Sequence, residues 1–435
     1  DEIITLFSTS DSLTIPLATG QPMALLNALS DRQDWEKLEV FCGLLSFPYP
    51  LLSNPNVYIK SGYYGPIERY LNEAGSHMEY LPANFRGFET YALRKPTHFI
   101  ATTLSAPDEE GYLTFGTHGA AAYKPFIAAC HSDSQIAIAE INTNMPTVYG
   151  DTELGDNKIH IDEIDVLYQT DNSQSEVPEI PFTDKEIKIA DNVLNLIENQ
   201  ATLQFGIGAI PNLIAEKLTK TNLGEFGVHS ELISDGFLAL QQAGKITNKH
   251  KGIYDGKSVF TFAFGKKSLY DFLDEKNGNN NRSAICLPVS TVNNPHIIAQ
   301  NKKFTSINSG LMIDFSGQVS SEAIGLRQYS GVGGQLSFVQ GAGQSLDGKS
   351  VLCIKSTATV KDKLVSNIMP TLPTGSIVST PRHFTQYIVT EYGIADLYGV
   401  SDEKRADKLI QIAHPDFRDE LREEFEKMRK IYYKN

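Results

Sequence analysis

The chain has 435 residues, of which 41% are hydrophobic, and its formal net charge at neutral pH is -14. This length and composition allow two domains with substantial cores and exclude general disorder. Because acidic groups are in excess and no basic patch is visible, we expect neither nucleic acid nor an anionic membrane as a partner.

Both halves of the chain alternate helical and strand-like segments. Residues 23–32 (MALLNALSDR) predict a helix, and residues 37–45 (KLEVFCGLL) predict a strand. Residues 257–265 (KSVFTFAFG) predict a strand, and residues 267–275 (KSLYDFLDE) predict a helix. Such alternation favours a mostly parallel sheet covered by helices over a sandwich or a helical bundle.

The clearest boundary in the chain is the polar segment 169–184 (QTDNSQSEVPEIPFTD), which contains two prolines. Directly after it, Thr183 and Glu186 have the spacing of a capping box at a helix start. The apolar face of that helix is predicted to consist of Ile187, Ala190, Val193 and Ile197. We therefore predict two α/β domains, residues 1–172 and residues 183–435.

The last segment, residues 416–433 (DFRDELREEFEKMRKIYY), predicts a helix that packs through one apolar face. That face consists of Phe417, Leu421, Phe425, Met428 and Tyr432. The charged residues between them are expected to be solvated.

The cysteines and histidines give no sign of a metal site. Cys42, Cys130, Cys286 and Cys353 lie far apart, which argues against a zinc site and a disulfide framework. No histidine pair has ligand spacing, so no metal is expected, although a site assembled from distant residues stays open. There is also no long apolar run or signal-peptide layout, and we expect a cytoplasmic protein without a membrane partner.

The first candidate site is residues 201–212 (ATLQFGIGAIPN). An apolar strand runs into Gly206 and Gly208, and a helix is predicted to open at Pro211, a residue favoured in a first helical turn. Such a turn seats a phosphate or a carboxylate well. The pattern is not GxGxxG, which disfavours a dinucleotide cofactor, and a purely structural turn stays an alternative.

The second candidate is Glu231, in residues 227–236 (GVHSELISDG). If the helix after Pro211 crosses back, these residues form the next parallel strand, and Glu231 lies near its carboxyl end. Ligands of open parallel sheets collect there. A solvated rim carboxylate that caps a turn is the alternative interpretation.

The third candidate is the glycine-rich stretch 329–343 (YSGVGGQLSFVQGAG). Such glycine density lets backbone N–H groups approach a ligand or an oxyanion, although a flexible loop or a bulged strand would look the same. Lys355, one predicted strand later, could supply a cation.

These segments occur in one order together with others, such as SAPDEEGYLTFG, AEINTNMPTVYGD and STPRHFTQYIVTEYGIADLYG. The combination resembles the class I CoA-transferases, in the acetyl-CoA hydrolase/transferase branch of the 4-hydroxybutyrate CoA-transferase type. It covers nearly the whole chain.

The resemblance implies two similar open α/β domains with the active site between them, and a homodimer. It makes Glu231 the nucleophile that forms a glutamyl-CoA thioester, and Gly333 and Gly334 the backbone donors to the thioester oxygen. Lys355 is implied to lie near CoA. The implied CoA-contacting turn consists of Gly208, Ala209, Ile210, Pro211 and Asn212.

The implied reaction moves CoA, as a substrate, between a short-chain acyl-CoA and a carboxylate such as acetate. With an ordinary pKa near 4.3, Glu231 would be ionised at neutral pH and would need no general base. An acetyl-CoA hydrolase with the same catalytic group is the first alternative, because only water access separates the two reactions. A non-catalytic acyl-CoA sensor is the second, although it has no need for a carboxylate at position 231.

Overall fold

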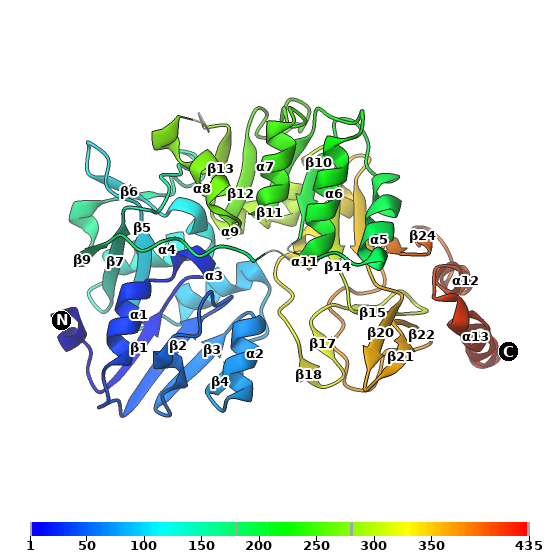
Figure 1. The fold of residues 1–435 in the computed structure, drawn as a ribbon, viewed down its shortest axis with the longest axis horizontal. Coiled ribbons are helices and arrows are strands. Elements are labelled where there is room, and N and C mark those ends of the chain that lie inside the picture. The colour runs from blue at the N-terminus through cyan, green and yellow to red at the C-terminus, as the bar shows by residue number, and fades with distance from the viewer. Residues whose placement is uncertain (1, 179–180, 207, 279–281, 433–435) are drawn as a thin grey trace. The chain divides into compact units, whose positions relative to one another are not determined.

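The computed structural model describes residues 2–178, 181–206, 208–278 and 282–432. The chain forms two compact units (Figure 1). The first consists of Asp1–Pro178, Ser230–Asp235 and Lys257–Asn294, and the second of Glu179–His229, Gly236–Gly256 and Pro295–Asn435. The division passes through strand β11 (Gly227–Ile233). The domain limits at residues 172 and 183 stay a prediction.

The first unit contains a seven-stranded sheet of order β4-β3-β2-β1-β5-β7-β9, whose neighbouring strands pair in parallel. The strands are β1 (Ser10–Thr14), β2 (Lys37–Cys42), β3 (Val57–Ser61), β4 (His77–Tyr80), β5 (Phe99–Leu104), β7 (Ile136–Asn142) and β9 (Val166–Thr170). Further strands of this unit are β6 (Tyr112–Thr114), β8 (Lys158–His160), β12 (Ser258–Ala263) and β13 (Ala284–Cys286). Its helices are α1 (Met23–Ser30), α2 (Pro66–Glu73), α3 (Phe85–Arg94), α4 (Gly119–Cys130), α8 (Lys267–Leu273) and α9 (Val289–Val292).

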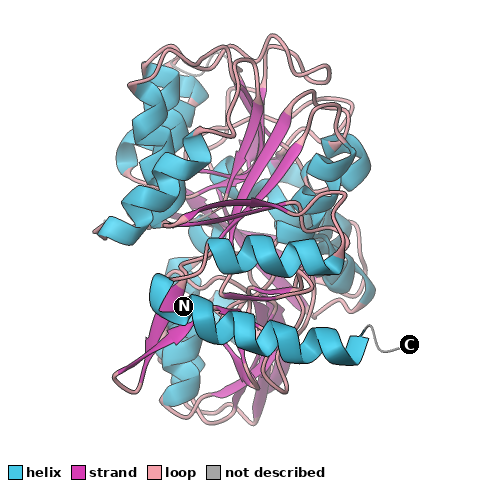
Figure 2. Ribbon diagram, turned by 90° about the vertical axis from the view of Figure 1, so that its right-hand side faces the viewer, coloured by secondary structure: helices cyan, strands magenta, loops and turns pink. Residues whose placement is uncertain are grey.

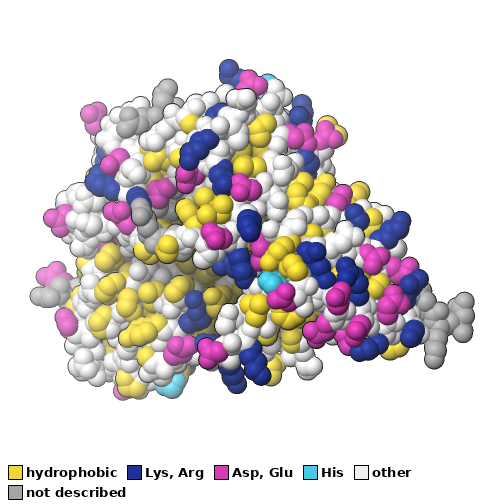
Figure 3. All heavy atoms as spheres, turned by 45° about the vertical axis from the view of Figure 1, so that its right-hand side comes forward, with side chains coloured by type: hydrophobic (Ala, Val, Ile, Leu, Met, Phe, Trp, Pro, Cys, Tyr) yellow, Lys and Arg dark blue, Asp and Glu magenta, His cyan; other side chains and the backbone are white. Residues whose placement is uncertain are grey.

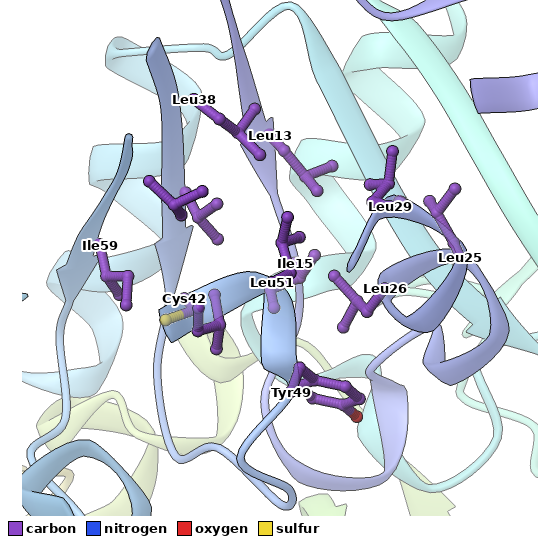
Figure 4. Close-up of a cluster of buried hydrophobic side chains, with 14 of the residues drawn as sticks. Leu13, Ile15, Leu25, Leu26, Leu29, Leu38, Cys42, Tyr49, Leu51 and Ile59 are labelled. Carbon is purple, nitrogen blue, oxygen red and sulfur yellow. The ribbon is translucent and has the colours of Figure 1, made fainter. Parts of the chain in front are cut away.

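Aliphatic side chains from β1, β2, β3 and α1 form the core beside this sheet (Figure 4). Leu13 and Ile15 leave the β1 segment toward Leu26 and Leu29 of α1, and all four are fully buried. Burying such a side chain stabilises the fold by about 1.5–3 kcal/mol relative to leaving it in water. The predicted helix at residues 23–32 and the predicted strand at residues 37–45 are therefore confirmed as α1 and β2.

The second large sheet has the order β13-β12-β11-β10-β14-β19-β23-β24. Strand β10 (Thr202–Phe205) pairs in parallel with β11 and with β14 (Phe304–Ser309), whereas β24 (Gly393–Asp396) pairs antiparallel with β23 (Tyr387–Thr390). The remaining strands are β15 (Met312–Asp314), β16 (Val319–Ser320), β17 (Ala323–Ile324), β18 (Arg327–Gln328), β19 (Lys349–Cys353), β20 (Thr357–Val360), β21 (Lys363–Ser366) and β22 (Ile368–Met369). The helices are α5 (Asp184–Leu194), α6 (Ala209–Thr219), α7 (Asp235–Gln242), α10 (Pro295–Ile298), α11 (Gln335–Gln344), α12 (Asp402–Gln411) and α13 (Arg418–Tyr432). Short 3-10 helices lie at Ile3–Leu6, Ala18–Gly20, Pro50–Ser53, Gly116–His118, Ile161–Glu163, Glu275–Asn277 and Pro415–Phe417.

Helix α5 starts at the predicted capping box, with the Thr183 side chain and the Glu186 side chain each bonded to the other's backbone. Its predicted apolar face is wrong at one position, because Ile187 is exposed and Ile189 is buried in its place. The predicted C-terminal helix is confirmed as α13, which lies beside α12 on the surface (Figure 2). Among the described residues, no helix combines the length and the apolar character needed to cross a bilayer.

Candidate active site

Glu231 lies inside strand β11, two residues before its end at Ile233. Its neighbours Ser230 and Leu232 are buried, whereas Glu231 keeps part of its surface exposed. Asn293 donates a hydrogen bond from Nδ2 to Glu231 Oε2 over 2.5 Å. Burial raises the pKa of the Glu231 carboxyl to about 7, although this bond favours the ionised form. The expectation that Glu231 is fully ionised at neutral pH is therefore wrong, because its carboxyl titrates in the neutral range.

Asn293 is the contact of Glu231 that the sequence did not indicate. It directly follows the short helix α9, and its N–H donates to the carbonyl of Val289 over 2.9 Å. The side chain is fully buried, and its Oδ1 has no hydrogen-bond partner among the described residues. Asn293 is one of two adjacent asparagines in STVNNP and belongs to no motif, so only the folded chain reveals its proximity to Glu231.

The Gly208–Asn212 turn begins helix α6 in the second unit. Gly208 is the N-cap with φ +132°, a conformation that side chains rarely adopt. The helix opens at Ala209, two residues before the predicted start at Pro211. Ile210 and Pro211 are buried, whereas Gly208, Ala209 and Asn212 are partly exposed. A ligand at this turn would therefore meet the partly exposed residues and the backbone.

A buried polar network holds the strand that leads into this turn. Asn308 of β14 and Gln204 of β10 are joined by two hydrogen bonds of 3.0 and 3.2 Å between their side-chain amides. Ser306 Oγ donates to Gln204 Oε1 over 2.7 Å, and the Gly206 N–H donates to the Ile307 carbonyl over 2.9 Å. Fully paired networks of this kind fix the backbone around them.

The glycine-rich stretch is a loop only as far as Gly334. Residues from Gln335 onward form helix α11, so the alternative interpretation, a flexible loop or a bulged strand, does not hold for its second half. Gly334 is the N-cap of α11, and Gly333 has φ +53°. Gln335 anchors this end of the helix, because its Nε2 donates to Ser321 Oγ over 2.9 Å and to Thr380 Oγ1 over 3.2 Å.

Lys355 follows strand β19 and pairs with Glu186, the capping-box residue of α5. The distance from Lys355 Nζ to Glu186 Oε1 is 2.6 Å. Burial alone would raise the pKa of Glu186, but hydrogen bonds from Lys355 and Thr183 hold it at about 2. The lysine side chain remains about half exposed, at 45%. Its ammonium is thus oriented by a carboxylate while one side stays open to solvent.

The structure brings Glu231 together with Asn293 in the first unit, and places the other predicted site residues in the second. Two of the predicted glycine turns are helix N-termini, at Gly208 and Gly334. Free N–H groups and the helix dipole make such termini favourable for phosphate or for a developing oxyanion. In the described part of the chain, no group of three or more His, Cys, Asp or Glu side chains is arranged to hold a metal ion.

On the face in Figure 3, Lys and Arg side chains are interspersed with Asp and Glu side chains. An example in the second unit is the exposed pair of Arg382 and Asp402, 3.2 Å apart. Pairs of this exposed kind contribute little to stability, about 0–1 kcal/mol each.

The comparisons with known proteins agree with this arrangement. The acetyl-CoA hydrolase/transferase C-terminal domain family matches residues 265–425. The chain is 39% identical to a 4-hydroxybutyrate coenzyme A transferase of Clostridium kluyveri, over 94% of this chain and 92% of that one. The chain belongs to the acetyl-CoA hydrolase/transferase family. The family resemblance, the α/β fold and CoA-transferase activity predicted from the sequence are thereby confirmed.

Other relatives place this family member among the transferases. A butyryl-CoA:acetate CoA-transferase of Anaerostipes caccae is 35% identical over 98% of this chain and 95% of that one. The crystal structure of RipA from Yersinia pestis matches with a TM-score of 0.88 and 32% identity, over 98% of this chain and 96% of that one. An acetyl-CoA hydrolase of Candida albicans is more distant, at 24% identity over 66% of this chain.

Proposed function

We propose that this CoA-transferase moves CoA from a short-chain acyl-CoA to a carboxylate such as acetate through a glutamyl-CoA thioester on Glu231. Acetyl-, butyryl- and 4-hydroxybutyryl-CoA are the proposed donors. The observation that carries the proposal is a carboxyl with its pKa raised to about 7, held by Asn293 within a strand. Perturbed carboxyls of this kind are typical of catalytic positions. A homodimer and a cytoplasmic location belong to the same proposal.

The reaction would proceed through two acyl transfers and their reversal. The Glu231 carboxylate attacks the thioester carbonyl, the carbon–sulfur bond breaks, and CoA thiolate leaves an acyl-glutamyl anhydride. The thiolate then attacks the glutamyl carbonyl, which gives glutamyl-CoA and releases the first carboxylate. A second carboxylate repeats these steps backward and departs as the new acyl-CoA.

The raised pKa of Glu231 bears directly on the first step. A free thiol has a pKa of about 8.5, and an ordinary glutamate is about four units more acidic, so thiolate is the poorer leaving group. A Glu231 pKa of about 7 narrows this gap to roughly 1.5 units. Burial thus makes the Glu231 carboxylate a stronger nucleophile. Hydrogen-bond donors to the thioester oxygen would lower the rest of the barrier.

The backbone donors of Gly333 and Gly334 are proposed to stabilise the thioester oxygen as negative charge develops on it. One well-placed donor of this kind is worth about 3–4 kcal/mol. The proposed CoA contacts are Lys355 and the Gly208–Asn212 turn. Binding of the long, unreactive part of CoA there would contribute further energy to the reacting centre.

Hydrolysis is the second candidate, because the family includes acetyl-CoA hydrolases such as the one from Candida albicans. If water reached the anhydride or the glutamyl thioester, the same groups would release free CoA. The two activities therefore differ in water access and share Glu231. The greater similarity to the transferases favours exchange.

The deciding experiment compares acyl exchange with release of free CoA. Acetyl-CoA would be incubated with propionate, butyrate or 4-hydroxybutyrate, and new acyl-CoA and free thiol would be measured together. We expect exchange to exceed release, and Glu231→Gln to lower exchange by about 1000-fold or more while CoA still binds. Release without exchange would favour the hydrolase, and an active Gln variant would contradict the role of Glu231.

A further inference from the structure

The hydrogen bond from Asn293 to Glu231 depends on how the backbone at Asn293 is held. Asn293 Nδ2 donates to Glu231 Oε2, whereas Oδ1 of the same side chain has no hydrogen-bond partner among the described residues. The amide is therefore not fixed by a second bond of its own. Because the bond holds one oxygen of the Glu231 carboxylate, it also sets the direction in which the other oxygen points. The orientation of the nucleophile thus depends on the turn of chain that carries Asn293.

That turn is helix α9, which is one helical turn long. The N–H of Asn293 donates to the Val289 carbonyl over 2.9 Å, and the N–H of Val292 donates to the Pro288 carbonyl over 3.1 Å. A single turn is not stable alone, because the first turn of a helix fixes several residues for one hydrogen bond. Val289 and Val292 are fully buried and attach the turn to the core. Its polar residue Ser290 is held by a separate set of contacts.

Ser290 lies against two other helices of the first unit, α3 and α4 (Figure 1). Lys124 of α4 donates from Nζ to Ser290 Oγ over 2.6 Å. The same Nζ lies 3.8 Å from Oε1 of Glu89, a residue of α3. Burial raises the pKa of the Glu89 carboxyl, whereas the charges of Lys124 and Arg86 and hydrogen bonding with Ser290 favour its ionised form. Glu89, Lys124 and Ser290 are called the Glu89 cluster below.

Helix α3 gives the Glu89 cluster a fixed base on the seven-stranded sheet. Phe88, the residue before Glu89, stacks on Phe41 of β2 with the ring centroids 4.3 Å apart. A Cβ atom added at Gly62, directly after β3, would lie 2.0 Å from the Phe88 ring, so the ring fills the space above this glycine. Close packing of this kind resists displacement. A shift of α9 relative to the sheet would therefore have to break the contacts of the Glu89 cluster.

Glu89 is a costly residue for a contact that would only stabilise the fold. It is buried, at 4% exposure, and its Oε2 has no hydrogen-bond partner in the described part of the chain. A buried polar atom without a partner costs about 1–3 kcal/mol. Apolar side chains often pack at least as stably in place of a buried ion pair. The Glu89 cluster is thus poorly suited to stabilise the fold, but it fixes where Ser290 lies.

We infer that the Glu89 cluster consists of positioning residues, which hold α9 so that Asn293 keeps the Glu231 carboxylate directed at the acyl carbon. The inference rests on the proposed function, in which Glu231 is the nucleophile. The cluster acts through Asn293 and without contact to the reacting atoms. A displacement of about 1 Å in such an arrangement can lower the rate of the chemical step by roughly 100-fold. The cluster should therefore affect kcat and not the binding of acyl-CoA.

The test replaces Ser290 with alanine, a good helix former that lacks the hydroxyl held by Lys124. The measurement is kcat and KM for exchange between acetyl-CoA and propionate. We expect Ser290→Ala to lower kcat by about tenfold and to change KM for acetyl-CoA by less than about twofold. The midpoint of the pH–rate profile should move to higher pH, because the bond that favours ionised Glu231 is weakened. Ser290→Thr keeps a hydroxyl and should restore both kcat and the midpoint.

Two matched controls separate this effect from a general loss of stability. Thr291→Ala removes a hydroxyl from the same turn but outside the Glu89 cluster, and it should leave kcat unchanged. Glu89→Gln removes the charge that pairs with Lys124 and should lower kcat. Glu68→Gln alters another buried carboxyl of the first unit, whose Oε2 also has no partner among the described residues, and it should leave kcat unchanged.

The decisive comparison repeats Ser290→Ala in an Asn293→Ala background. Because the Glu89 cluster acts through Asn293, the second substitution should lower kcat there by less than about twofold. An unchanged kcat in Ser290→Ala, or full additivity of the two substitutions, would overturn the inference. Equal losses in Ser290→Ala and Thr291→Ala would also overturn it. Continued exchange in Glu231→Gln would instead contradict the proposed function.

Discussion

At the scale of single residues, Glu231 combines two opposing influences on its charge. Burial disfavours the carboxylate and raises its pKa to about 7, whereas the hydrogen bond from Asn293 stabilises it. The nucleophile of the proposed reaction must be ionised. Activity should therefore depend on pH in the neutral range, where an ordinary glutamate would already be fully charged.

We predict that kcat/KM for acyl-CoA rises with pH, reaches half of its plateau near pH 7, and is lost as pH falls below that value. In Asn293→Ala, the carboxylate loses the bond that favours it, so the midpoint should move to higher pH. The measurement is a pH–rate profile of both proteins with the same acyl-CoA.

Glu68 supplies the control for this profile, because burial also raises its pKa to about 7. Its Oε1 accepts a hydrogen bond from the N–H of Leu45, which a glutamine oxygen can still accept. Glu68→Gln should leave the midpoint in place. A midpoint that follows Glu68, or one that stays fixed in Asn293→Ala, would contradict the assignment of the titration to Glu231.

The sequence indicated Glu231 through its position near the end of a strand and through family resemblance. It did not indicate the raised pKa, which depends on burial and on a partner in another part of the chain. The same limit applies to Lys355, whose pairing with Glu186 links the end of one strand to the start of a distant helix. A local sequence pattern shows which residue types occur, but it does not show which residues from distant parts of the chain lie close together.

At the scale of elements, helix α11 contains two glycines whose surroundings differ. A Cβ atom added at Gly341 would lie 2.4 Å from Ile298 Cγ2 of α10, so close packing of the two helices requires glycine there. A Cβ atom added at Gly343 would meet nothing within 4 Å. The two positions in one helix therefore form a matched pair for mutation.

We predict that Gly341→Ala lowers the free energy of unfolding by about 1–3 kcal/mol, because one of the helices must shift. Gly343→Ala should raise it by about 0.5–1 kcal/mol, because alanine is the better helix former. Urea unfolding of both variants measures the difference. Since Gly334 begins the same helix, Gly341→Ala should also reduce exchange activity. Equal stability of the two variants would contradict the packing argument.

The sequence predicted the bounds of an element best where a local motif, such as a capping box, determines where the element begins. The capping box at Thr183 and Glu186 fixed the start of α5 correctly. The apolar face of the same helix was wrong at Ile187, because helical spacing alone does not say which of two neighbouring isoleucines meets the core. The glycines of residues 329–343 predicted a loop, yet α11 accepts Gly341 because a neighbouring helix needs the space.

At the scale of the whole molecule, alternation of strands and helices predicted parallel sheets, and both large sheets are mostly parallel. The sequence did not predict that residues 257–294 belong to the first unit. They join it through contacts that no local pattern encodes. Within that unit, the Thr147 N–H donates to Asp274 Oδ1 over 3.0 Å, and the Glu275 N–H donates to the Thr147 carbonyl over 2.9 Å.

The central claim is that acyl-CoA converts Glu231 into a thioester. The most direct test incubates the protein with acetyl-CoA, reduces it with borohydride, and locates the changed residue by peptide mass spectrometry. Reduction of a glutamyl thioester leaves an alcohol in place of the carboxylate, and we expect this product at Glu231 and its absence in Glu231→Gln. An unmodified Glu231 in a protein that still exchanges CoA, or modification at another carboxylate, would contradict the account.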